Sequence, residues 1–255
     1  MKTIRWCSGA ALGLLLFGCG AADLDPIEVE ASVGTAEEAE EELQKPHFYR
    51  VYGNGFAECH DFDYLLGTAG FSITNAGLTR IVPRGGIPVE LEVEAWGGTQ
   101  VTAEGVCSEA LGDMRFGQSL TGTQTVSCQD GQVAVGGGGF CHSGKLYRSR
   151  PDPDNDESEP HGWAVGCTSG PVDAYVICRD RENVFDFKNC KTQRKDSTGS
   201  ATLVCPSNTK AISAGGYCGG NTPLTALNLH NTLTGAKVQC QSSSASVHAY
   251  VVCCG

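Results

Sequence analysis

The chain has 255 residues, among them 34 glycines and 14 cysteines, with 7% aromatic residues and a formal net charge of -11. This composition argues against a large helical core and favours short strands, turns and disulfide bonds. The acidic charge balance argues against a nucleic-acid-binding protein, so no nucleic-acid partner is expected.

The first 18 residues have the composition of a signal peptide. Lys2 and Arg5 precede an apolar run of 12 residues, 6–17, which is too short to span a bilayer. The run ends in Leu16-Phe17-Gly18-Cys19, which resembles the lipobox of bacterial lipoproteins, with Phe17 bulkier than the usual residue at its position.

This resemblance implies cleavage before Cys19 and acylation of that cysteine. The lipid would be the only membrane attachment, and the expected location is the outer membrane or surface of a bacterial cell. Secretion after cleavage near Ala21 or Ala22 is the alternative. Residues 19–45 are rich in Asp and Glu and contain one basic residue, Lys45, which predicts a solvated acidic spacer.

Three copies of one pattern follow the spacer. "CHDFDYLLGTAGFS" starts at Cys59, "CQDGQVAVGGGGFC" at Cys128 and "CPSNTKAISAGGYC" at Cys205, and each has an aromatic residue 12 positions after its first cysteine. The copies close with "VTAEGVC", "VDAYVIC" and "VHAYVVC". These matching positions indicate an internal triplication, with repeats at 46–110, 117–180 and 190–255.

The closing segments predict strands with one buried face. Residues two apart share a face of a strand, so Val172, Ala174, Val176 and Cys178 are expected to point inward. Asp173, Tyr175 and Ile177 are expected to line the other face. The glycine runs predict a bulge or a close crossing of two backbones. A phosphate-binding loop is disfavoured, because neither a lysine nor a helix follows the glycines.

The repeats also constrain the disulfide bonds. With Cys7 removed and Cys19 acylated, 12 cysteines remain, and the first repeat keeps only the outer two of the four found in the other repeats. Because the two inner cysteines are absent together from the first repeat, we infer that they bond to each other in the repeats that contain them. The predicted bridges are Cys59–Cys107, Cys128–Cys178, Cys205–Cys253, Cys141–Cys167, Cys218–Cys240 and, by elimination, Cys190–Cys254.

Ser72 and Trp96 stand where the inner cysteines are expected in the first repeat. The alternation in "VELEVEAW" places Val89, Leu91, Val93 and Ala95 on one face and Trp96 on the other with Glu90, Glu92 and Glu94. An exposed Trp96 is either a stacking platform for a sugar ring or an ordinary packing residue. Trp163 and Tyr147 are the other candidate ligand-binding residues.

An acidic insertion, 151–163, interrupts the second repeat. Asp152, Asp154 and Asp156 alternate as calcium ligands do, but Glu157 occupies the place of the turn glycine, and a bidentate acid is missing at the twelfth position. A solvated acidic hairpin loop is therefore favoured over a calcium site, and no cofactor is expected.

The remaining apolar segments read as short strands at 145–150, 161–167, 224–231 and 236–241, and leading strands are expected before Cys128 and Cys205. The predicted fold is all-β, with three internally repeated units, each stapled by disulfides. The units form either separate small sandwiches or one body with pseudo-threefold symmetry.

No catalytic motif is recognisable, so an enzyme is not expected. A hairpin in the second repeat would bring His142 and His161 together, although surface positions are commoner for such histidines. Residues 120–255 resemble repeats of secreted bacterial proteins of unsettled function, through Cys205-Pro206, Gly162-Trp163-Ala164-Val165 and the Tyr-Val-Val-Cys close. That resemblance implies a non-catalytic extracellular module.

Three functions remain open at this point. The leading hypothesis is a surface-displayed lipoprotein that binds a glycan or a protein partner as an adhesion module. The main alternative is an envelope-structural or inhibitor-like scaffold whose rigidity comes from its disulfides. The third is a hydrolase whose site has no recognisable sequence motif.

Overall fold

The computed structural model describes residues 48–60, 63–109, 112–181 and 189–255. The predicted signal peptide, Cys19 and the acidic spacer lie outside these residues. The described chain consists of strands joined by turns, with one short 3-10 turn, which confirms the all-β prediction. Within it, no helix is long and apolar enough to cross a membrane.

Six strands make up unit 1. They are β1 (Tyr49–Asn54), β2 (Phe56–Glu58), β3 (Tyr64–Ser72), β4 (Leu78–Arg84), β5 (Glu90–Ala95) and β6 (Val101–Ser108). Unit 3 repeats this arrangement with β11 (Lys191–Thr198), β12 (Ser200–Val204), β13 (Lys210–Cys218), β14 (Leu224–Leu229), β15 (Gly235–Cys240) and β16 (Ser246–Cys254). The 3-10 turn η1 (Gly219–Asn221) lies between β13 and β14.

Unit 2 has fewer but longer strands, which differs from the short strands predicted. Its strands are β7 (Asp113–Ser119), β8 (Thr123–Ser127), β9 (Gln132–Asp152) and β10 (Gly162–Asp180). Asn75 and Gly220 take positive φ values in the turns that divide the corresponding strands of units 1 and 3. In unit 2, Gly144 also takes a positive φ value, but the ladder continues past it through shifts in register, with Ser143 paired to Ser169, so the strands do not break. Strand β7 also begins before position 117, the expected start of the repeat.

Each unit is built from two three-stranded halves. In unit 1 the halves are β1-β6-β3 and β4-β5-β2, and in unit 3 they are β11-β16-β13 and β14-β15-β12. In unit 2, β9 and β10 serve both halves: residues 172–178 of β10 pair with β7, and residues 162–166 pair with β8. β9 pairs with β10 along the whole length of both strands.

The halves of different units join edge to edge, so the units form one body. The junctions pair β3 with β14, β13 with β9 and β9 with β4, through Phe71↔Ala226, Tyr217↔Arg148 and Phe140↔Arg80. Unit 1 thus joins unit 3, unit 3 joins unit 2, and unit 2 joins unit 1. This closed cycle is the pseudo-threefold arrangement, and the interpretation as separate sandwiches is wrong.

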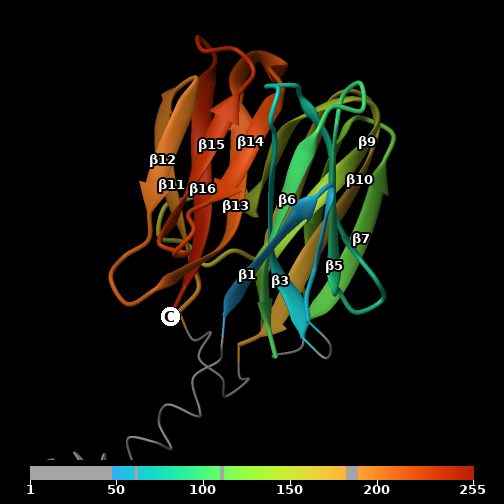
Figure 1. Ribbon diagram of the computed structural model, residues 1–255. Coiled ribbons are helices and arrows are strands. Elements are labelled where there is room, and N and C mark those ends of the chain that lie inside the picture. The colour runs from blue at the N-terminus through green and yellow to red at the C-terminus, as the bar shows by residue number, and fades with distance from the viewer. Residues whose placement is uncertain (1–47, 61–62, 110–111, 182–188) are drawn as a thin grey trace, which may run out of the picture.

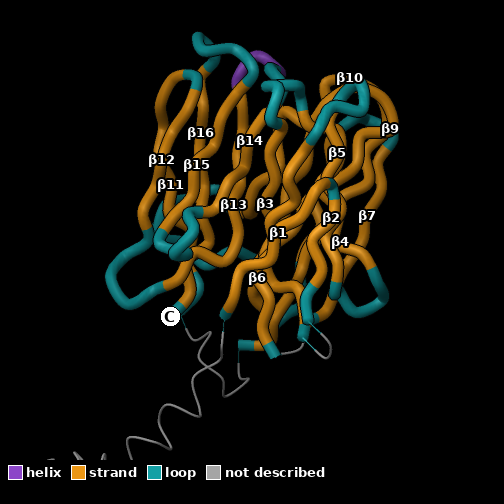
Figure 2. Tube along the Cα trace, in the orientation of Figure 1, coloured by secondary structure: helices purple, strands orange, loops and turns teal. Residues whose placement is uncertain are grey.

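A single hydrophobic cluster fills the space between the units. Unit 3 occupies one side of the molecule and units 1 and 2 the other (Figure 1). The turn η1 and the C-terminus lie at opposite ends, and the described chain enters near the C-terminal end (Figure 2).

The glycine runs lie where strands of different units cross. A Cβ atom on Gly67 would lie 1.6 Å from the carbonyl oxygen of Ile212, and one on Gly136 would lie 2.4 Å from that of Leu66. The ladders also shift register next to these crossings, between Leu65 and Gly67 for example. The close crossing and the bulge predicted from sequence are therefore both present.

The disulfide bonds are those predicted from the repeats. Three outer bridges hold the ends of β6, β10 and β16, two inner bridges close units 2 and 3, and one bridge ties the linker before β11 to the C-terminus. The pairs are Cys59–Cys107, Cys128–Cys178, Cys205–Cys253, Cys141–Cys167, Cys218–Cys240 and Cys190–Cys254.

The residue that replaces the second inner cysteine in unit 1 is Ala95, not Trp96. Leu78 pairs with Ala95 as Leu146 pairs with Cys167, so the structural register differs by one residue from the count along the chain. The hydroxyl of Ser72, which replaces the first inner cysteine, accepts a hydrogen bond from the Ala76 amide (3.1 Å).

Candidate functional site

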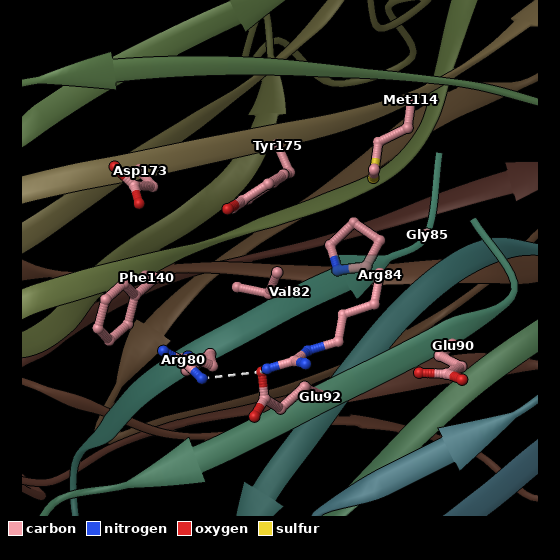
Figure 3. A pocket seen from close by; sticks show the side chains of 11 residues that line it. Arg80, Val82, Arg84, Gly85, Glu90, Glu92, Met114, Phe140, Asp173 and Tyr175 are labelled. Carbon is pink, nitrogen blue, oxygen red and sulfur yellow. Dashed lines mark hydrogen bonds and ion pairs between the residues drawn. The ribbon is translucent and has the colours of Figure 1, made fainter. Parts of the chain in front are cut away.

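An open cleft of about 640 Å³ crosses the junction between units 1 and 2. Strands β4, β5, β7, β9 and β10 contribute to its lining (Figure 3). We call it the first cleft. The charged, phenolic and aromatic side chains discussed below are those of Arg80, Arg84, Glu92, Phe140, Asp173 and Tyr175.

Strand alternation directs these side chains outward. Val172, Ala174 and Val176 are fully buried, as predicted, so Asp173 and Tyr175 point to the opposite face of β10. Arg80, Val82 and Arg84 likewise alternate along β4. The pairing of Arg80 with Phe140 places the outward face of β4, in unit 1, beside the outward face of β9 and β10, in unit 2.

Two arginines bind one carboxylate at the floor of the cleft. Arg80 Nη1 and Arg84 Nε each lie 2.8 Å from Glu92 Oε2, and Arg84 Nη2 also contacts this oxygen. The exposed position predicted for Glu92 is therefore wrong: the carboxylate is buried because the two guanidinium groups cover it. These charge-assisted hydrogen bonds hold all three side chains in place.

Aromatic rings border the arginine pair. The Arg80 guanidinium carbon lies 4.1 Å from the centroid of the Phe140 ring, a cation–π contact. On the far side, the Tyr175 ring lies 5.1 Å from that of Phe116, which is exposed. The cleft thus offers apolar ring surface next to fixed polar groups.

Asp173 has hydrogen-bonding capacity to spare. Its Oδ2 atom lies 3.0 Å from His142 Nε2, whereas the buried Oδ1 atom has no hydrogen-bond partner among the described residues. Burial raises the pKa of the neighbouring Tyr175, and the Asp173 carboxylate raises it further, so this hydroxyl remains a donor. Together, Asp173 and Tyr175 place a carboxylate and a phenolic donor in the lining of the cleft.

Two of the three aromatic residues predicted to bind a ligand are core residues instead. Trp163 is fully buried, and its Nε1 donates to Ser149 Oγ at 3.0 Å. Tyr147 is buried against Gly166 and packs edge-on to Tyr217. Trp163 points inward because it shares a strand face with Val165, and Gly137 leaves room for the indole ring.

Trp96 is exposed, as predicted, with 54% of its surface accessible. Trp96 directly follows β5, and its ring lies 5.6 Å from Lys145 Nζ of unit 2. It does not line the first cleft, so the structure gives it a contact between units rather than a place in this site.

The acidic insertion is docked on the protein rather than fully solvated. Asp154 Oδ2 lies 3.2 Å from Arg150 Nη1, and Asp156 Oδ1 accepts from the Arg194 amide at 2.9 Å. These two weak candidates for calcium ligands therefore contact an arginine side chain and a backbone amide. Across the described ranges, no three His, Cys, Asp or Glu side chains are grouped to hold a metal ion.

His142 and His161 do not meet. They lie on the same hairpin, but the His161 amide donates to Asp152, ten residues further along β9 than His142. That separation corresponds to about 33 Å along a strand. His142 contacts Asp173, and His161 lies 3.3 Å from Arg181 Nη2.

Sequence inspection missed the first cleft. The alternation of the closing strand did place Asp173 and Tyr175 outward, which is the one signal that pointed to this face. Their partners Arg80 and Glu92 come from another repeat. Only the ladder between β4 and β9 brings them together.

No protein-family model matches this sequence, and no curated protein shows significant similarity to it.

Proposed function

We propose that this protein is a non-catalytic, surface-displayed lipoprotein that binds a neutral glycan through the first cleft. The observation that carries this proposal is the Asp173 carboxylate, which lines the cleft and is oriented by His142. A carboxylate held in this way accepts hydrogen bonds from ligand hydroxyl groups, and such charge-assisted hydrogen bonds are stronger than those between neutral groups.

The polar groups of the cleft suit a polyhydroxyl ligand. Arg80 and Arg84 are held by Glu92, so their remaining N–H groups are presented in fixed directions. Asp173 supplies acceptors and Tyr175 a donor. A sugar ring carries neighbouring hydroxyl groups that both donate and accept, and it can use all of these groups at once.

The aromatic groups suit the apolar face of a sugar ring. Phe140 and Tyr175 line the cleft. The Arg80 guanidinium covers one face of the Phe140 ring, and the exposed Phe116 ring lies 5.1 Å from that of Tyr175. Such rings provide flat apolar area beside the polar contacts, as small-molecule sites generally do.

The charge balance favours a neutral glycan over a sulfated or sialylated one. Arg80 and Arg84 carry two positive charges, and Glu90, Glu92 and Asp173 carry three negative charges. The cleft therefore has no excess of positive charge to attract an anionic sugar. The chain as a whole is also acidic.

These contacts preorganise the cleft for binding. One oxygen of Glu92 accepts from both arginines, and one oxygen of Asp173 contacts His142. The carboxylates are thus held in fixed hydrogen bonds, as in a preorganised binding site.

Surface display rests on the lipobox resemblance at Cys19. The described chain enters near the C-terminal end of the body (Figure 2), so a lipidated spacer would leave the opposite end directed away from the membrane. Replacing Cys19 by Ala is expected to abolish incorporation of labelled fatty acid and to release the protein from the membrane fraction. Retention in the membrane would contradict lipid anchoring.

A glycan array tests the binding function. The full chain, purified in a detergent without a sugar headgroup, is applied to cellotetraose, mannotetraose, galactotetraose and chitotetraose, together with sialylated and sulfated glycans. We expect binding to at least one of the neutral tetrasaccharides and weaker binding to the acidic glycans.

Asp173→Asn is expected to weaken that binding at least about tenfold, because hydrogen bonds to charged groups contribute about 1.5–3 kcal/mol. Asp130→Asn makes the same chemical change at an exposed position and is the control. Binding of protein partners alone, or unchanged affinity at the first cleft in Asp173→Asn, would overturn the proposal.

A further inference from the structure

A second cleft, of about 600 Å³, lies on the face where unit 1 joins unit 3. It is lined by Arg50, Tyr52, Phe71, Thr102, Glu104 and Asn231. We call it the second cleft.

The second cleft occupies the same place in the pseudo-threefold body as the first. Phe71 pairs with Thr102 as Phe140 pairs with Asp173. The residue two positions further along the closing strand, Glu104, corresponds to Tyr175. Both clefts are thus centred on the same strand pair of their units.

The surrounding strands correspond as well. Tyr52 pairs with Glu104 on β6 as Phe116 pairs with Tyr175 on β10. Across the junction, Phe71 pairs with Ala226 of unit 3, where Phe140 pairs with Arg80 of unit 1. Each cleft therefore spans a junction between two units.

The side chains of the second cleft are different but supply the same kinds of group. Glu104 is 1% exposed and accepts from the Leu229 amide at 2.8 Å and from Arg50 Nη2. Arg50 Nη1 also donates to Asn231 Oδ1 at 2.6 Å. A guanidinium group is again fixed by a buried carboxylate, and the pair has no net charge.

Aromatic surface is again available beside this ion pair. Tyr52 is 73% exposed, and its ring lies 5.7 Å from the Arg50 guanidinium carbon. Phe71 lines the cleft from β3. Tyr52 and Phe116 hold equivalent positions. Both rings are exposed to solvent, so neither is needed for packing of the core.

The third face is covered. Tyr250, which corresponds to Tyr175, is 1% exposed and donates to Asp154 Oδ2 at 3.4 Å. Arg194, which corresponds to Tyr52 and Phe116, donates from Nη1 to the Asp154 carbonyl oxygen at 3.4 Å. The acidic insertion of unit 2 thus occupies the position that the other two faces leave open.

We infer that the second cleft is a further binding site for a neutral glycan, so that each chain carries two glycan sites on different faces and links two glycan chains. This inference rests on the proposed function of the first cleft. Because the two sites lie on different faces, binding would hold two separate glycans together and gain strength from multivalency.

Native mass spectrometry of the full chain, released from detergent micelles, counts bound oligosaccharides directly. The probes are cellotetraose, mannotetraose, galactotetraose and chitotetraose. We expect up to two bound molecules of the tetrasaccharide that binds. Tyr52→Ala and Asp173→Asn should each reduce the maximum to one, and the double variant should bind none.

Leu120→Ala is the matched control, because Leu120 is exposed and lies outside both clefts. It should still bind two molecules, and all variants should retain the thermal midpoint of the unmodified chain. A maximum of one, lost in Asp173→Asn and unchanged in Tyr52→Ala, would overturn the second site and leave the first. Absence of binding to every tetrasaccharide would overturn the proposed function and this inference together.

Discussion

Gly67 of unit 1 and Ile212 of unit 3 meet through their backbones, with no space for a side chain between them. Gly136 of unit 2 has the same relation to Leu66. Unit 3 has Ser213 at the corresponding place, and its hydroxyl donates to the Thr68 carbonyl oxygen at 2.9 Å. Glycine is therefore required at this position in units 1 and 2, where strands of different units approach one another, whereas unit 3 accommodates a serine side chain.

Replacing Gly67 by Ala is expected to destabilise the protein by about 3 kcal/mol or more. The new methyl group would overlap the Ile212 carbonyl, and both backbones belong to packed strands that cannot separate without disrupting the core. The free energy of unfolding, measured in denaturant, reports the loss.

Gly86→Ala is the control for this substitution. A Cβ atom on Gly86 would meet nothing within 4 Å. Its free energy of unfolding should change by less than about 0.5 kcal/mol. Similar losses for Gly67→Ala and Gly86→Ala would contradict the proposed reason for the glycine runs.

The disulfide map is the second prediction. A digest under non-reducing conditions should yield Cys128 linked to Cys178 and Cys141 linked to Cys167. Peptides in which cysteines of different repeats are linked would be inconsistent with three units that each close on themselves. Mass spectrometry with and without reduction identifies the pairs.

The outer bridge of unit 3 should stabilise the fold more than the inner one. Cys205–Cys253 closes 48 residues and Cys218–Cys240 closes 22. In the chain-entropy model these loops contribute about 4 and about 3.4 kcal/mol. Paired replacement of each bridge by alanines, followed by denaturant unfolding, compares them, and greater damage from loss of the inner bridge would contradict the ordering.

The two described tryptophans are expected to respond oppositely to mutation. Trp163→Ala should cost about 3–5 kcal/mol of stability, because it leaves a large cavity and removes the donor to Ser149. Trp96→Ala should change stability little and leave tetrasaccharide binding intact, because Trp96 is exposed and outside both clefts. Loss of binding in Trp96→Ala would restore the stacking role suggested by its exposure.

The disulfide pairs and the alternation of the closing strands could be predicted because both repeat along the chain. Cys128 and Cys178 are the outer cysteines of one repeat, and the distance along the chain between the outer cysteines is nearly the same in all three repeats. Asp173 could be placed on the outer face for the same reason. These features depend on short-range geometry and on comparison of the repeats.

The clefts could not be predicted, because they form between repeats. Arg80 and Phe140 are 60 positions apart, and no local pattern specifies that β4 pairs with β9. The burial of Glu92 depends on two arginines from the neighbouring strand. Trp163 is buried because Gly137 leaves space above its ring, which is a tertiary property.

The pH dependence of stability provides a test at the second cleft. Burial raises the pKa of Glu104 above its ordinary value of 4.5, although the Leu229 amide and Arg50 both act in the opposite direction. The folded chain then holds this proton more tightly than the unfolded chain does. The contribution of Glu104 to stability is present below about pH 4.5 and is lost as the pH rises through the higher, folded-state pKa.

Glu104→Gln removes this titration and retains an acceptor for the Leu229 amide. We therefore expect the free energy of unfolding of the variant, relative to that of the unmodified chain, to increase as the pH is raised from 4 to 7. Urea unfolding of both chains at several pH values measures this difference, and equal urea slopes show that the effect lies in the native state. A relative decrease over the same range would mean that the ion pair with Arg50 outweighs burial, and the buried carboxylate would then be a net source of stability at neutral pH.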